Sequence, residues 1–547
     1  MIDEKDILIP MRDGVKIAVR VYRPDGEAPV PALFAASPYR YDNDALPAIP
    51  IFLWRETGPI DWYVEHGYAY VHADVRGTGY SEGEYSYLGP IEQRDLYELI
   101  EWVGTQPWCT GKVGTIGQSY YAKTQWFIGI QKPPHLTCLG LYDGQTDPYR
   151  AVGYPGGIES NFLPYWFAQS CRLVNRFPAN GDHPREVEHD ILLDVQRHPL
   201  YDDYWKERSP SERLHEITTP LLSIGVWAKL DLHLYGNIIG YQRASGFKKL
   251  SITGTATPMS SMVDFADPAF HEKYLLPFYE HFLKGVENGF EDRPNVEYVV
   301  KNTGVTRTFE TWPPPGVARR TYYLSSAPSG SVTSLNDGSL TTAAPGAKSD
   351  ATTYSYPQPS WTLGVVTVGP DGPDPVRAVV TYTTPPLERD VEIAGSGALF
   401  LHLSTTGTDT DVLVKVSEVM AQAPADRTSG KQPRYTIVTK GWLRASHSFE
   451  RHAMLDSPEM AYYAHEHPTP LVPGKSYELE VPLQPMAYRF RKGNRIRVEI
   501  ANGDSAVTDG LFAHAYRPDK VGADTFYHDA ARPSRLVLPV LDIDYVS

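Results

Sequence analysis

Cysteine is scarce in this sequence of 547 residues, which contains only Cys109, Cys138 and Cys171. An odd count without CxxC spacing speaks against a disulfide framework and against a zinc or redox motif. We therefore expect three small buried side chains in a reducing compartment, with no metal and no cofactor.

Long apolar runs and an excess of basic residues are also missing. No stretch of about 18 apolar residues occurs, so we expect no helix that crosses a bilayer. The sequence starts with MIDEKD, which lacks the basic and then apolar pattern of a signal peptide, so we expect a cytoplasmic protein. Lys plus Arg is 51 against 66 for Asp plus Glu, and the net charge of −15 repels nucleic acid and anionic lipid. The sequence does not determine the oligomeric state, and a homo-oligomer is compatible with it.

A hydrophobic content of 41% in a chain of this length favours two or three domains with substantial cores. Apolar runs alternate with helical patterns from residue 31 onward, which favours an α/β core with a mainly parallel sheet. We assign this core to residues 1–150 and 217–312. Residues 151–216, which are aromatic and polar, are predicted to form an inserted helical cap. Residues 313–547, rich in Ser, Thr, Gly, Pro and Val, are predicted to form an all-β domain.

A serine stands at the junction of a predicted strand and a predicted helix. The strand runs from Val113 to Ile116, Gly117 permits a sharp turn, and Ser119 opens the helical stretch. A serine in such a place is commonly a helix cap. The same context is that of a nucleophile elbow, in which the N–H of the next residue, Tyr120, points at a developing oxyanion.

Five stretches together resemble the CocE/NonD hydrolases, which group with X-Pro dipeptidyl-peptidases and α-amino-acid ester hydrolases. They are residues 37–40 (SPYR), 74–83 (DVRGTGYSEG), 117–126 (GQSYYAKTQW), 147–150 (DPYR) with 156–158 (GGI), and 441–447 (GWLRASH). In the third stretch, Ala122 replaces a glycine of the family motif. The resemblance implies an α/β-hydrolase core, a helical cap and a C-terminal jelly roll, acting on a small-molecule ester, lactone or amide through an acyl-enzyme.

The resemblance also implies roles for particular residues. Ser119 is the nucleophile, and the oxyanion donors are the Tyr120 N–H and the hydroxyl of Tyr39. Without the resemblance, Tyr39 would be read as a core tyrosine. Aromatic residues in the loops and the cap are candidates for the pocket lining, although a core position is the commoner reading. These candidates are Trp54, Trp166 and Phe167.

The residues that should activate the serine depart from the family pattern. A serine needs a histidine base that a carboxylate orients. In the segment after the next-to-last core strand, Lys229 takes the usual position of the acid, and Asp231, two residues later, is our candidate for that role. After the last strand, Ala256 or Thr257 stands where the histidine belongs. Loss of one triad member costs roughly a millionfold in a serine protease.

Three explanations of this loss stay open at the level of sequence. Ala256 is an engineered replacement of a histidine, or another group such as His233 or Lys229 is the base, or the scaffold has moved to ligand binding or to a lyase or isomerase reaction. A carbohydrate-binding role of the β domain is a further alternative that rests on the jelly-roll inference alone.

Overall fold

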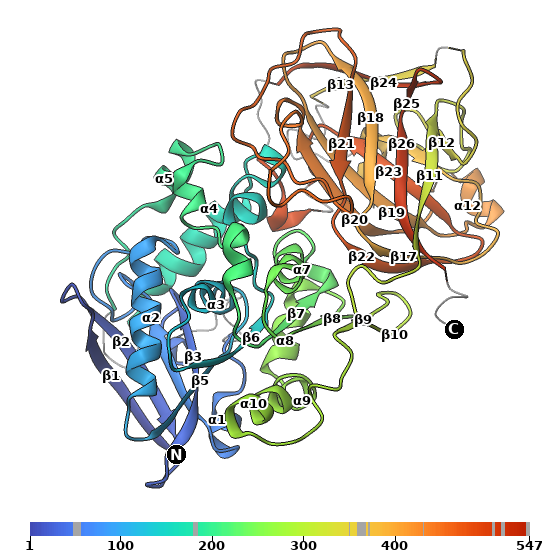
Figure 1. Cartoon of the computed structure of the whole chain (residues 1–547). Coiled ribbons are helices and arrows are strands. Elements are labelled where there is room, and N and C mark those ends of the chain that lie inside the picture. The colour runs from blue at the N-terminus through green and yellow to red at the C-terminus, as the bar shows by residue number, and fades with distance from the viewer. Residues whose placement is uncertain are drawn as a thin grey trace.

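A computed structural model describes residues 1–46, 56–178, 184–348, 350–357, 368–369, 372–429, 431–505, 509–515 and 520–542. Figure 1 shows an α/β part that carries the N-terminus and a β-rich part that carries the C-terminus. All three cysteines are unpaired and buried, as the sequence predicted. Within the ranges above, no helix has the length and apolar character needed to span a bilayer.

The α/β part is built on a ten-stranded sheet in the order β1-β2-β4-β3-β5-β6-β7-β8-β9-β10. The neighbours from β4 to β9 run parallel, while β1, β2 and β10 pair antiparallel at the edges. The strands are β1 (Ile2–Pro10), β2 (Lys16–Arg23), β3 (Val30–Ser37), β4 (Ala69–Asp74), β5 (Cys109–Thr115), β6 (Leu136–Tyr142), β7 (Leu221–Val226), β8 (Lys248–Thr253), β9 (Val296–Val299) and β10 (Thr306–Phe309). The parallel core that the alternating pattern predicted is therefore confirmed.

Helices cover both faces of this sheet, which is why strands such as β4 and β7 are buried along their whole length. The principal ones are α1 (Ile60–Glu65), α2 (Pro90–Gly104), α3 (Tyr120–Gln131), α7 (Leu234–Arg243), α8 (Pro258–Ala266), α9 (Pro268–Lys273) and α10 (Leu275–Lys284). Helix α3 is buried on every side from Tyr120 to Ile130, so it is a central element rather than a surface helix.

The segment predicted as a cap consists of short helical pieces. They are η2 (Tyr149–Gly153), η3 (Pro155–Gly157), α4 (Phe162–Trp166), η4 (Phe167–Leu173), η5 (Val174–Arg176), α5 (Ile191–Arg197), α6 (Asp203–Lys206) and η6 (Ser211–Glu216). The segment is tied to the loop after β3, because the Arg40 guanidinium donates to the Val174 carbonyl at 3.0 Å and the Asn175 amide donates to Pro38 at 3.1 Å. It therefore lies over the carboxyl end of a central strand.

The C-terminal part is all β, as predicted, and contains a sheet of fourteen strands. These are β11 (Val317–Ser325), β12 (Gly338–Thr341), β13 (Ala351–Tyr356), β16 (Val380–Thr383), β17 (Val391–Gly395), β18 (Ala398–Thr405), β19 (Asp411–Val419), β20 (Tyr435–Arg444), β21 (Tyr477–Pro482), β22 (Met486–Phe490), β23 (Arg495–Ala501), β24 (Gly522–Asp529), β25 (Arg532–Pro533) and β26 (Arg535–Leu541). It contacts the α/β part directly: Arg150 donates to the carbonyl of Tyr463 at 2.7 Å.

Candidate active site

The carboxyl ends of the central strands bring together residues that are far apart in the sequence. In a parallel sheet these ends meet at one edge, where ligands commonly bind. The residues that follow β3, β5, β6, β7 and β8 there are Tyr39, Ser119, Asp143, Lys229 and Ala256. The structure thus gathers four of the residues singled out from sequence and adds Asp143.

Ser119 has the strained backbone of an elbow, with φ 61° and ψ −117°. A non-glycine residue with positive φ is uncommon and persists only where its surroundings hold it. Here the Ser119 N–H donates to Tyr142 at 3.1 Å, and the Gln118 N–H donates to the Glu56 carbonyl at 2.9 Å. A Cβ on Gly117, which has φ 138°, would lie 2.2 Å from Cβ of Tyr121, so the turn requires glycine there. Ser119 is therefore held in place from both sides.

Tyr39 is buried beside the elbow and its hydroxyl oxygen accepts a hydrogen bond from the Trp166 indole N–H at 2.8 Å. Burial raises the pKa of Tyr39 well above its ordinary value, so the phenol stays protonated and remains a donor. Trp166, a pocket candidate from sequence, thus contacts an oxyanion candidate. Phe167 is fully buried, with the Arg172 guanidinium 5.4 Å from its ring centre. Trp54 lies outside the described residues.

The side chain of Tyr120 is engaged away from the serine, because its hydroxyl donates to Glu92 at 2.7 Å and accepts from Tyr85 at 3.2 Å. Its backbone N–H belongs to the first turn of α3, where N–H groups have no partner within the helix. Only this N–H fits the donor role that the sequence predicted.

Lys229, at the position of the family's acid, forms a buried ion pair with Asp143 at 3.0 Å. Asp143 also accepts from the Gln118 amide at 2.9 Å. Burial raises the pKa of Asp143, and the Lys229 cation opposes that shift. The ammonium of Lys229 is therefore engaged by a carboxylate, which weakens the hypothesis that a neutral Lys229 is the base.

Removal of one partner of this pair is expected to destabilise the protein. In Lys229→Met the Asp143 carboxylate stays buried without its cation, so the free energy of unfolding should fall by about 3–5 kcal/mol, measured by urea denaturation at pH 8. The deficit should shrink as the pH falls, because protonation removes the unpaired charge of Asp143. The double variant Lys229→Met/Asp143→Asn, which removes both charges, is the control and should recover most of the loss; a single variant as stable as the wild type would refute the coupling.

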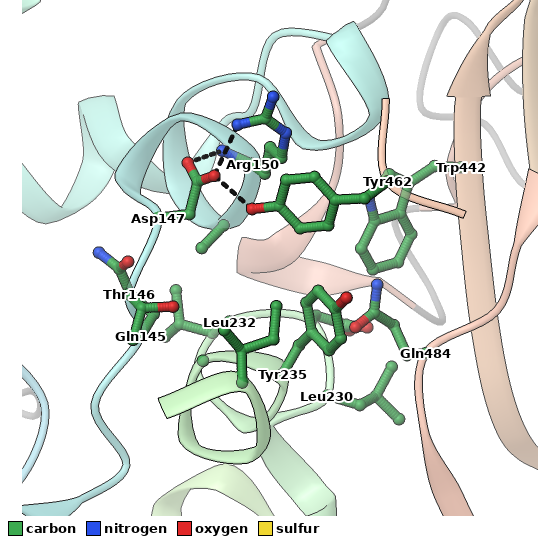
Figure 2. A pocket seen from close by; sticks show the side chains of 14 residues that line it. Gln145, Thr146, Asp147, Arg150, Leu230, Leu232, Tyr235, Trp442, Tyr462 and Gln484 are labelled. Atoms are coloured by element: carbon green, nitrogen blue, oxygen red, sulfur yellow. Dashed lines mark hydrogen bonds and ion pairs between the residues drawn. The ribbon is translucent and has the colours of Figure 1, made fainter. Parts of the chain in front are cut away.

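Asp231, our candidate acid, is placed in a different setting. Its carboxylate lies 2.7 Å from Lys440 of the β domain, and Lys440 also contacts Asp509 at 3.0 Å. It lines a cavity of about 40 Å³ at the junction of the α/β and β parts, next to the Asp147–Arg150 ion pair of 2.6 Å (Figure 2). A cavity of this size holds one or two waters rather than an acyl substrate. These contacts do not support an orienting role for Asp231 toward a base at Ser119.

The candidate base His233 and a second buried histidine, His271, are not available as bases either. His233 is buried, and burial together with the cations of Lys229 and Lys123 lowers its pKa well below the ordinary value. His271 lies in α9, with one ring nitrogen 2.8 Å from the Tyr63 hydroxyl and the other 2.6 Å from the Phe265 carbonyl. Ala256 is exposed in the turn between β8 and α8. No contact in the described structure links either histidine to Ser119.

Sequence reasoning missed two ionisable residues beside the elbow, Glu56 and Lys123. Burial raises the pKa of Glu56 to about 7, opposed by the cations of Lys229 and Lys123 and by hydrogen bonding with the Ser119 side chain. Burial lowers the pKa of Lys123 to about 8, and its ammonium lies 5.9 Å from the ring centres of both Tyr120 and Trp166. Lys123 is a charged residue in an otherwise uncharged elbow helix, and the sequence did offer that signal. No such signal pointed to Glu56, which lies 63 positions before Ser119.

A parallel sheet covered by helices on both faces, with a serine in a strained strand-to-helix turn at its carboxyl edge, is the architecture of an α/β-hydrolase. Comparison with known proteins narrows this class. The sequence-family model of the X-Pro dipeptidyl-peptidase (S15 family) matches residues 13–255. The family model of the X-Pro dipeptidyl-peptidase C-terminal non-catalytic domain matches residues 288–537.

Individual relatives match over almost the whole length. Cocaine esterase of Rhodococcus sp. (strain MB1 Bresler) is 26% identical, with 98% of each chain covered. The crystal structure of a CocE/NonD family hydrolase from Staphylococcus aureus superposes with a TM-score of 0.80 at 25% identity, covering 99% of this chain and 94% of that one. An α-amino-acid ester hydrolase has a TM-score of 0.73 at 19% identity over 98% of this chain and 96% of that one, which shows the fold alone. The chain belongs to the CocE/NonD family of serine hydrolases.

Proposed function

We propose that this protein hydrolyses a carboxylic ester, lactone or amide through an acyl-enzyme on Ser119. The observation that carries the proposal is the strained elbow of Ser119, with φ 61°, held against the end of β6. Strain of this kind at a strand-to-helix turn exposes a hydroxyl for attack and is otherwise a cost to the fold.

The oxyanion of the tetrahedral intermediate is assigned to the Tyr39 hydroxyl and the Tyr120 N–H. The Trp166 N–H donates to the Tyr39 oxygen at 2.8 Å, which fixes the position of the hydroxyl group. A phenol fixed in this way needs little reorganisation when charge develops on the substrate. Residues 151–216 and the loop after β3 supply the acyl pocket, with Trp166 and Phe167 as its aromatic residues.

A second candidate function is ligand binding without hydrolysis. The Lys229–Asp143 pair of 3.0 Å favours it, because a cation stands at the position of the family's acid and no histidine occupies position 256. Both candidates bind a small acyl compound at the same edge of the sheet, and they differ in whether the Ser119 oxygen becomes covalently bound.

A fluorophosphonate probe distinguishes the two. The wild type at pH 8 is expected to gain one probe mass, and peptide mapping should place it on Ser119. Ser119→Ala is the matched control and should gain none. Ala256→His serves as a second arm, because an imidazole at that position restores the family's arrangement. Failure of both the wild type and Ala256→His to react at Ser119 would overturn the proposal in favour of binding alone.

A further inference from the structure

Ser119 needs a group that accepts its proton, and the elbow is surrounded by ionisable side chains that the family pattern does not use. Asp143 is paired with Lys229 at 3.0 Å and accepts from Gln118 at 2.9 Å. The Lys123 ammonium lies over two aromatic rings. Among the side chains that the structure describes here, Glu56 is the carboxylate whose pKa the neighbouring Ser119 side chain helps to lower.

The backbone fixes Glu56 against the elbow. Its carbonyl accepts the Gln118 N–H at 2.9 Å, one residue before the nucleophile, and lies 3.5 Å from a Cβ built on Gly117. Glu56 itself has φ 50°, a second strained non-glycine residue at this site. The backbone of Glu56 is therefore joined directly to the elbow.

The carboxyl group is also incompletely satisfied. Its Oε2 atom is buried and has no hydrogen-bond partner among the residues that the structure describes. Buried carboxylate oxygens are normally paired, and an unpaired one at a site of chemistry is where an incoming group is expected. A water or a leaving group beside Ser119 would fill this position.

We propose that the Glu56 carboxylate is the general base that activates Ser119, in place of the histidine absent from position 256. This inference rests on the proposed function, since a base is needed only if Ser119 attacks a carbonyl. The electrostatics support it. Burial raises the pKa of Glu56 to about 7, and a base works best when its pKa lies near the working pH.

Each proton that Glu56 accepts in this mechanism is passed on in the next step. Glu56 takes the hydroxyl proton of Ser119 as the bond from Oγ to the carbonyl carbon forms, and the displaced electron pair moves to the oxygen held by Tyr39 and the Tyr120 N–H. The protonated Glu56 then gives that proton to the leaving alkoxide or amine as its bond to carbon breaks. In deacylation a water gives its proton to Glu56 and attacks the acyl carbon, and Glu56 returns the proton to Oγ. One water is consumed, and nothing is oxidised or reduced.

The test compares pH profiles of kcat/KM for p-nitrophenyl acetate. For the wild type, kcat/KM is expected to rise with pH through about 7 and then level off, because only the ionised Glu56 accepts a proton. Glu56→Gln, which has the same shape without the basic oxygen, is expected to lose about 10²–10⁴-fold and the ionisation near neutral pH. The exposed Glu65→Gln on α1 removes one carboxylate of the same type nearby and should leave the profile unchanged.

Formate rescue separates a chemical role from a structural one. In Glu56→Ala, added formate supplies a carboxylate to the space left by the side chain and is expected to restore part of kcat, with no effect on the wild type. A Glu56→Gln variant that keeps the wild-type profile overturns the role of Glu56 and leaves the proposed function intact. Absence of turnover in the wild type, together with absence of fluorophosphonate labelling in both the wild type and Ala256→His, overturns the proposed function itself. If Glu56→Gln does not fold, the pH profile of kcat/KM for Glu56→Asp is measured instead. An ionisation that is retained but shifted in pH supports Glu56 as the general base, and an ionisation at the wild-type pH refutes that role.

Discussion

Ser119→Ala is expected to lower kcat/KM for a simple acyl ester by about 10³–10⁶-fold, the range over which serine hydrolases lose activity without their nucleophile. Alanine keeps the Cβ, so the backbone at φ 61° is equally strained in the variant and the wild type. The loss is therefore attributable to the missing oxygen and not to a relaxed turn. Steady-state kinetics at pH 8, with the hydrolysis blank subtracted, measures it.

Ser429→Ala is a suitable control, because that serine lies at the end of α12 (Pro424–Thr428) in the β domain and donates to the Asp426 carbonyl. It should have the kinetics of the wild type. If Ser119→Ala hydrolyses the ester as fast as the wild type, the serine is not a nucleophile and the site works, if at all, without an acyl-enzyme.

Tyr39→Phe is expected to reduce kcat by about 10²–10³-fold with little change in KM, because an oxyanion donor acts chiefly in the transition state. The variant also leaves the Trp166 N–H, now 2.8 Å from the Tyr39 oxygen, without its acceptor. A buried unsatisfied donor costs about 1–3 kcal/mol of stability, which a thermal melt reports separately.

Trp166→Phe separates the catalytic effect of the Tyr39 hydroxyl from the effect of its hydrogen bond with Trp166. The variant removes the N–H donor but leaves the Tyr39 hydroxyl in place. A smaller loss of kcat than in Tyr39→Phe is expected. Tyr477→Phe in the β domain, whose hydroxyl accepts from the Val472 N–H, serves as the matched tyrosine control. A rise of KM alone in Tyr39→Phe would assign Tyr39 to substrate binding and remove it from the oxyanion hole.

The site combines a scaffold of the family type with an altered set of charges. The elbow and Tyr39 lie in two of the stretches that resemble the family pattern. The acid and base positions do not, because Lys229 is paired with Asp143 and position 256 is an exposed alanine. The half-buried Glu56 and the buried Lys123 add two further ionisable groups beside the nucleophile. The proposed hydrolysis therefore requires groups other than the usual histidine and aspartate.

Local sequence was enough for the elbow and the parallel core. The strand ending near Gly117, the glycine itself and the helix after Ser119 lie within one short segment, so their order can be read from local spacing. The all-β character of the C-terminal part was predictable for the same reason, from alternating β-branched and aromatic residues.

Contacts between distant segments were not predictable in this way. Asp231 was chosen because it stands two residues after Lys229, yet its carboxylate turns to Lys440, which is 209 positions further along the chain. Asp143 and Glu56 both contact Gln118 of the elbow. They do so only because strand order places the ends of β5, β6 and β7 side by side and the Glu56 backbone packs against the elbow.

The amino-acid sequence by itself thus determined the scaffold, the nucleophile candidate and the absence of a histidine at position 256, since each depends on residue identity and short-range spacing. Only the tertiary structure decided which charges surround Ser119. A buried charge is stabilised by the partner that the packing of remote segments brings within about 4 Å. The identity of that partner does not follow from the local spacing of residues in the sequence.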